Sequence, residues 1–179
     1  MTFYKNRYRI ESTRLKEWDY SSRGYYYITI CTKNREMLFG NVVNGKIVLS
    51  EIGKTVDSEW LKSFEIRPEL LCDEYCIMPN HIHGIVFING NNENDLNDRN
   101  DVNKTNLAVK TDGIIIKRLP RSISSFIAGF KSSATKRIND LRKTPRKPVW
   151  QPRFYDHIIR DDHDLQRIRK YIQNNPINW

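Results

Sequence analysis

Two histidines, His81 and His83, stand on either side of one isoleucine in the stretch CIMPNHIHGIVFI. The run that follows them is apolar and rich in β-branched residues, which is typical of a buried β-strand. Residues two apart in a strand point to the same face, so both imidazoles should project together while Ile82 enters the core. Such a pair can share one metal ion, each ring giving one nitrogen. A His-x-His pair alone is common, so a further ligand and a reactive group are needed.

A second group of candidate residues lies in a helix predicted near the end of the sequence. Asp161 is expected to cap this helix, with Asp164 at the third position, and the helix continues to Asn175 before Pro176 stops it. At 100° per residue, three apolar residues form its buried stripe. These are Leu165, Ile168 and Ile172.

Tyr171 and Asn175 lie four residues apart on this helix, so they share one edge of the apolar stripe. The Tyr171 hydroxyl is therefore expected to be half buried beside an amide. Helix geometry leaves two interpretations open. The residue is either an amphipathic tyrosine at the boundary of the core or a reactive phenol.

The elements that must position these side chains follow an antiparallel α+β pattern. A central strand is predicted at Gly24–Thr32, a hairpin around Asn44-Gly45, and two strands, 70–78 and 81–88, around a Pro79-Asn80 turn. A helix capped by Ser50 should run to about Phe64. Its apolar face is predicted to hold Ile52, Val56, Trp60 and Leu61.

The segment RSISSFIAGFKSSATKRINDLRK predicts another amphipathic helix, and a short strand is expected within VWQPRFYDHIIRD after it. The apolar face of this helix is predicted to consist of Ile123, Phe126, Ile127, Phe130, Ala134 and Ile138. Its outer, cationic face is predicted to carry Lys131, Lys136, Arg137 and Arg142.

The 179 residues suit a single domain, 1–179, with a flexible insert at about 89–113. That insert is rich in asparagine and aspartate and has almost nothing to bury. No apolar stretch approaches the roughly 20 residues that cross a bilayer. The three cysteines are an odd number at no metal-site spacing, so reduced thiols in a cytoplasmic protein are expected.

Positive charge is concentrated in the second half of the sequence. The whole chain carries +9, whereas residues 114–160 hold twelve Lys or Arg against two acids, a balance of +10. A basic segment of this kind is a candidate phosphate-binding surface. Charge alone leaves open the alternative of a solvated face without a ligand.

Three motifs resemble the single-tyrosine HUH transposases, most closely the REP-associated tyrosine transposases. In chain order they are YYYITICTKNREMLFG, MPNHIHGIV and VWQPRFYDHIIRDDHDLQRIRKYIQNNP. The resemblance covers nearly everything except the first twenty-odd residues and the insert. It implies a ferredoxin-like HUH domain, with a central antiparallel sheet and helices packed on one face. The pair His81 and His83 is then the HUH motif, on a middle strand.

The resemblance also implies a role for each candidate residue. His81 and His83 would bind a divalent metal ion, Mg²⁺ or Mn²⁺, and Tyr171 would attack DNA to form a 5′-phosphotyrosine. Asn175 falls where relatives place a polar third ligand, often glutamine. Because asparagine is one methylene shorter, His157 stays open as the alternative third ligand.

The implied partner is single-stranded or hairpin DNA, without any membrane. The basic helix face would follow the DNA backbone, and basic residues near the N-terminus would grip a hairpin foot. A monomer is favoured over a homodimer. The candidate DNA-binding residues are Arg14, Lys16, Arg121, Lys131, Lys136 and Arg137.

Three other functions compete with a transposase. An HUH replication-initiator or relaxase-like nickase would use the same chemistry, but the compact chain has no helicase. A domesticated DNA-binding protein that no longer cuts would not need its intact histidines and tyrosine. A zinc phosphoesterase that uses His81, His83 and His157 would leave Tyr171 without a role.

Overall fold

The computed structural model describes residues 14–15, 17–90 and 120–179, together with four short strands outside these ranges. Strand β1 (Phe3–Tyr4) pairs with β2 (Arg7–Tyr8), and β8 (Val109–Thr111) pairs with β9 (Ile114–Ile116). Most of the expected insert at 89–113 lies outside the described residues, so its flexibility stays a prediction. The part of it at 109–111, however, is a paired strand.

Four antiparallel strands form the central sheet, in the order β10-β3-β7-β6. They are β3 (Gly24–Cys31), β6 (Leu70–Met78), β7 (His81–Ile88) and β10 (Tyr155–Ile159). Helix α1 (Glu51–Ile66) lies between the first two of these strands in the chain, and α2 (Ile123–Arg142) lies between the last two. This β-α-β-β-α-β order is the ferredoxin-like arrangement, and β7 is a middle strand, as predicted.

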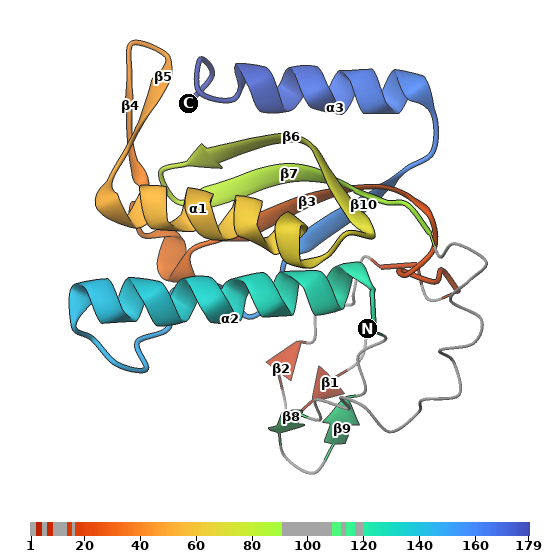
Figure 1. Ribbon diagram of the computed structural model, residues 1–179, viewed down its shortest axis with the longest axis horizontal. Helices are drawn as coiled ribbons and strands as arrows, with labels where there is room; N and C mark the ends of the chain where they lie inside the picture. Colours follow the sequence, from red (N-terminus) through yellow and green to blue (C-terminus); the bar gives the residue numbers. More distant parts are fainter. Residues whose placement is uncertain are drawn as a thin grey trace.

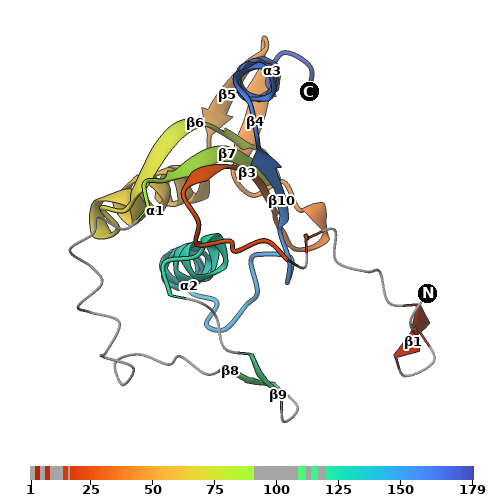
Figure 2. The ribbon, with the colours of Figure 1, turned by 90° about the vertical axis from the view of Figure 1, so that its right-hand side faces the viewer.

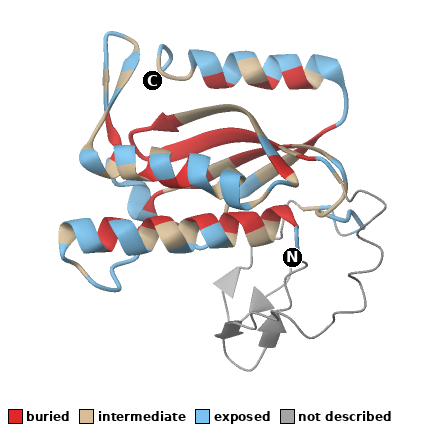
Figure 3. Ribbon diagram, in the orientation of Figure 1, coloured by how far each residue is buried: buried red, intermediate tan, exposed pale blue. Residues whose placement is uncertain are grey.

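Helices cover both faces of this sheet, which corrects the expectation of helices on one face. Helices α1 and α2 lie side by side on one face, and α3 (Asp162–Asn174) lies across the other (Figures 1 and 2). The sheet therefore has two apolar layers, and most of β7 and the helix sides that face the sheet are buried (Figure 3). None of the described helices is long and apolar enough to cross a membrane.

The larger apolar layer lies between the sheet and the pair α1 and α2. Trp60 of α1 is fully buried, with ring centroids 5.5 Å from Phe126 and 5.2 Å from Phe130 of α2. All six apolar residues predicted for α2 are buried. Leu61, in contrast, is 44% exposed, so its place on the apolar face of α1 was wrong. It follows Trp60 by about 100° of helix rotation, which turns it toward solvent.

The hairpin and the cap predicted before α1 are both present. Strand β4 (Gly40–Val43) pairs with β5 (Lys46–Leu49), and both turn residues between them, Asn44 and Gly45, have positive φ. The hydroxyl of Ser50 then accepts a hydrogen bond of 3.1 Å from the Gly53 amide and caps the helix.

Gly53 gives a direct test of how closely α1 packs on the preceding segment. A methyl group at this position would overlap the carbonyl oxygen of Phe39. We expect Gly53→Ala to lower the free energy of unfolding by about 1–3 kcal/mol, measured by urea denaturation, because the backbone must shift. Gly129 in α2 is the matched control, since the nearest atom to its added methyl is 3.9 Å away. Gly129→Ala should stabilise by about 0.5–1 kcal/mol, and an equal loss in both variants would contradict the argument.

Candidate functional site

The two histidines of β7 face the side of the sheet that α3 covers. In the register, His81 lies opposite Cys31 and His83 opposite Thr29 of β3, while Ile82 enters the larger core. The Nε2 atoms of the two imidazoles are 2.9 Å apart, and both side chains are buried. The expectation that the two rings project together is confirmed.

The hydrogen bonds of Asn80 determine which nitrogen of His81 carries the proton. The side-chain amide of Asn80 donates to the Arg35 carbonyl at 3.3 Å, which leaves its oxygen 2.7 Å from Nδ1 of His81. An amide oxygen only accepts, so Nδ1 of His81 donates and its Nε2 keeps a free lone pair.

The hydrogen-bond partners of Nδ1 of His83 are hydroxyl groups, which suit either tautomer of the ring. Nδ1 of His83 lies 2.8 Å from the Tyr27 hydroxyl and 2.9 Å from the Thr29 hydroxyl. Because a hydroxyl both donates and accepts, His83 can hold its proton on Nδ1 or on Nε2. Outer hydrogen bonds of this type orient imidazoles that ligate metals.

Both histidines are neutral at ordinary pH. Burial lowers the pKa of His81 to about 4, and the nearby charge of Arg35 adds to the effect. Burial also lowers the pKa of His83 to about 3, with further contributions from His81 and Arg35. Neutral imidazoles have the lone pairs that a metal ion requires.

These pKa values predict how stability depends on pH without metal. In the unfolded chain the histidines have a pKa near 6.5, so as the pH falls they bind protons at a higher pH than the folded ones do. The free energy of unfolding is therefore highest above pH 6.5 and decreases as the pH falls. For His83 the loss should reach roughly 2 kcal/mol at pH 5. Urea unfolding at pH 8 and pH 5, with a chelator present, should show a smaller loss in His83→Gln than in the parent protein. The same loss in both would contradict this origin.

The spacing of the histidines fits a shared metal ion. Two nitrogens bound at about 2.1 Å and at a right angle are about 3.0 Å apart, close to the 2.9 Å between the two Nε2 atoms. Within the described residues, no cluster of three His, Cys, Asp or Glu forms around any point. A zinc site that uses His81, His83 and His157 is therefore not supported.

The structure brings Tyr171, the predicted nucleophile, close to this pair. Its hydroxyl lies 3.5 Å from Nε2 of His83, and the two ring centroids are 5.3 Å apart. The residue is 50% exposed and lines a pocket, so a substrate can reach its side chain. Asn175, the predicted third ligand, caps the C-terminus of α3, and in the described part of the chain its side chain makes no hydrogen bond to either histidine.

Two acidic residues in a bulge of β6 hold α3 in place. The register of β6 against β7 shifts between Cys72 and Tyr75, and Asp73 lies within this irregularity. Arg169 of α3 donates to both carboxylate oxygens of Asp73, the shortest contact being 2.7 Å. One turn along α3, Gln173 donates to the carboxylate of Glu74 at 2.7 Å. These contacts and the buried stripe of α3 fix the position of Tyr171.

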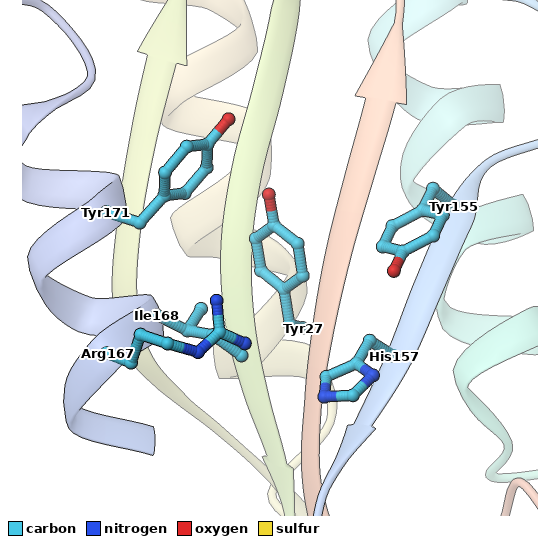
Figure 4. A pocket seen from close by; sticks show the side chains of 6 residues that line it. All are labelled: Tyr27, Tyr155, His157, Arg167, Ile168 and Tyr171. Carbon is cyan, nitrogen blue, oxygen red and sulfur yellow. The ribbon is translucent and has the colours of Figure 1, made fainter. Parts of the chain in front are cut away.

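A pocket of about 250 Å³ opens beside Tyr171. Tyr171 and two other α3 residues line one side of it, Tyr155 and His157 of β10 line the other, and Tyr27 lies between them (Figure 4). We call it the tyrosine pocket. Its full lining is Tyr27, Tyr155, His157, Arg167, Ile168 and Tyr171.

The candidate DNA-binding residues do not surround this pocket. Helix α2 lies on the opposite face of the sheet from α3 (Figures 1 and 2), and none of its basic residues lines the pocket. The prediction that Lys131 lies on the outer face of α2 was wrong. This side chain is half buried and donates to the carbonyls of Gln151 and Arg153 at 2.8 and 3.0 Å. Burial lowers its pKa to about 8.

Two more of the candidate cations have partners within the protein. Arg137 pairs with Glu59 at 2.5 Å, and Arg14 pairs with Asp156 at 2.8 Å. Lys136 and Arg121 are exposed, and Lys16 lies outside the described residues. The contacts of all six residues with DNA stay a prediction.

Comparisons with the sequences of known proteins find two relatives. No family model matches the chain. An uncharacterized protein of Haemophilus influenzae is 39% identical over 169 residues, which are 94% of this chain and 88% of that protein. Another protein of Haemophilus influenzae, named "Putative REP-associated tyrosine transposase", is 27% identical over 151 residues, 80% of this chain and 74% of that protein.

A solved structure shows the same fold. It is a REP-associated tyrosine transposase bound to a REP hairpin, with a TM-score of 0.60 and 18% identity over 93% of this chain and 74% of that chain. The chain therefore has a transposase-like α+β fold. The chain belongs to one family with the first Haemophilus influenzae protein, and its predicted resemblance to the REP-associated tyrosine transposases is confirmed.

Proposed function

We propose that this protein is a metal-dependent transposase that cuts and rejoins single-stranded or hairpin DNA through a 5′-phosphotyrosine. One observation carries the proposal: the hydroxyl of the half-exposed Tyr171 lies 3.5 Å from Nε2 of the buried, neutral His83. The similarity to proteins named as transposases, one of them bound to a DNA hairpin, supports the same function.

The reaction exchanges one phosphate ester for another. The Tyr171 oxygen attacks the scissile phosphorus, the bond from phosphorus to the 3′-oxygen breaks, and that oxygen leaves as a 3′-hydroxyl. The phenol loses one proton and the leaving oxygen gains one, so the step needs neither ATP nor water. Because the covalent ester keeps the energy of the broken bond, a second 3′-hydroxyl can reverse the step.

His81 and His83 would hold the divalent ion, Mg²⁺ or Mn²⁺, with Asn175 proposed as the third ligand. Imidazole ligands favour Mn²⁺ over Mg²⁺, which prefers shells of oxygen atoms. The bound ion supplies stabilisation of the negative charge that grows on the phosphate oxygens. The role of Asn80 is to keep Nε2 of His81 free of its proton, through the hydrogen bond to Nδ1.

The protein should act as a monomer. Both halves of the site come from one chain, because α3 packs on its own sheet through Asp73 and Glu74. No residue of a second copy is needed to bring Tyr171 to His83.

A gel assay with labelled hairpin DNA tests the proposal. In the presence of Mn²⁺ or Mg²⁺, DNA labelled at its 3′ end should shift into a denaturant-resistant complex with the protein. DNA labelled at its 5′ end should instead give a shorter free fragment that terminal transferase can extend at its 3′-hydroxyl. Cleavage without any covalent complex would indicate a hydrolytic nuclease and contradict the proposal.

A further inference from the structure

The tyrosine pocket has aromatic walls that suit a flat ring. The ring of Tyr27 lies between those of Tyr155 and Tyr171, with centroid distances of 6.0 and 6.4 Å. Both outer rings stand nearly edge-on to Tyr27, at 68° and 89°, and lie on either side of it (Figure 4). Tyr155 is 49% exposed, so its ring can pack against a ligand as well as against the protein. Aromatic side chains of this kind stack unpaired bases of single strands.

The polar side of the pocket carries hydrogen-bond donors. His157 of β10 and Arg167 of α3 both bind the carboxylate of Asp164, at 2.6 and 2.5 Å. Burial opposes ionisation of this carboxyl, but the hydrogen bonds from His157 and Arg167 lower its pKa, so it stays charged. The carboxylate balances the charge of Arg167, which makes this wall better suited to the carbonyl oxygens of a base than to a second phosphate.

We propose that the tyrosine pocket receives one unstacked base of the DNA strand, from a nucleotide next to the phosphate that Tyr171 attacks. The pocket shares the Tyr171 side chain with the cleavage site, so the base and the phosphate are neighbours along the strand. This inference rests on the proposed function, since it assumes that single-stranded DNA reaches Tyr171.

The test measures binding in a protein that cannot cut. In the full chain carrying Tyr171→Phe, fluorescence anisotropy gives the affinity for a labelled strand of twelve thymidines and for an abasic strand of the same length. Thymine has carbonyl oxygens that can accept from the guanidinium of Arg167. Adding Tyr155→Leu should weaken thymidine binding about tenfold and abasic binding less than twofold, because only the stacked base is lost.

Two matched variants show whether the loss of the Tyr155 ring causes the weaker thymidine binding. Tyr155→Phe keeps the ring and should retain tight thymidine binding, whereas loss in this variant would assign the effect to the hydroxyl. Tyr25 lies on the same face of β3 but outside the pocket, and Tyr25→Leu should leave both affinities unchanged. Equal weakening of both strands by Tyr155→Leu, or no weakening of either, would overturn the proposal.

A second measurement needs no change at Tyr155. In the same Tyr171→Phe protein, tetranitromethane should nitrate the exposed Tyr155, and mass spectrometry can follow the extent of nitration. The thymidine strand should protect Tyr155 and the abasic strand should not. Equal protection by both strands would overturn the base pocket. Because neither measurement requires cleavage, failure of the gel assay and failure of this inference remain distinguishable.

Discussion

Tyr171→Phe should abolish the covalent protein–DNA complex, lowering its yield at least about a thousandfold, as expected when a nucleophile is removed. The change deletes one hydroxyl, which lies 3.5 Å from Nε2 of His83. The ring is half exposed, so its packing and the stability of α3 should hardly change. The measurement is the denaturing gel with 3′-labelled hairpin DNA, alongside anisotropy to show that DNA binding persists.

Tyr155→Phe is the matched control for this experiment. Tyr155 lines the same pocket and is 49% exposed, close to the 50% of Tyr171, but it comes from β10 rather than α3. The control should form the covalent complex at a normal yield. A complex that persists in Tyr171→Phe and vanishes in Tyr155→Phe would move the nucleophile to β10.

The main features of the site could be predicted because they depend on local periodicity. The period of two in a strand places His81 and His83 on one face, and the helical period places Tyr171 at the edge of a stripe. Neither pattern shows which face of the sheet receives α3. That choice depends on contacts between distant segments, such as Arg169 with Asp73, 96 residues apart in the sequence.

The outer hydrogen bonds of the histidines also escaped prediction. Tyr27 and Thr29 read as ordinary residues of a β-strand, and only the register of β3 against β7 brings their hydroxyls to Nδ1 of His83. Asn80 reads as a turn residue, although its side chain determines the tautomer of His81. One signal was available for the bulge: two consecutive acids interrupt the apolar run LLCDEYCIM.

The basic residues show why charge is a weaker guide than periodicity. Net charge counts Lys131 and Arg137 as surface cations, but both have partners within the protein. Lys131 donates to the carbonyls of Gln151 and Arg153, and Arg137 pairs with the carboxylate of Glu59. A cation whose charge is balanced inside the protein contributes little to phosphate binding. Arg35, which the sequence did not single out, lies close enough to lower the pKa of both histidines.

Loss of either histidine should remove metal binding. Both His81→Gln and His83→Gln should weaken the affinity for Mn²⁺ at least about a hundredfold, measured by calorimetry, because each ring supplies one of two protein nitrogens that lie 2.9 Å apart. Asn80→Ala should weaken it about tenfold through the tautomer of His81, within the range that outer hydrogen bonds have on metal sites.

The third ligand is decided by comparing Asn175 with His157 in the same experiment. Asn175→Ala should weaken Mn²⁺ binding about tenfold, and Asn175→Gln should retain it, since glutamine restores the longer amide expected from the family resemblance. His157→Gln should leave Mn²⁺ affinity unchanged, because the ring is already bound to Asp164 at 2.6 Å. Normal affinity in Asn175→Ala together with a loss in His157→Gln would place the imidazole in the metal shell. The ion would then connect β7 to β10 rather than to α3, and Tyr171 would be positioned by Asp73, Glu74 and the buried stripe of α3 without the ion.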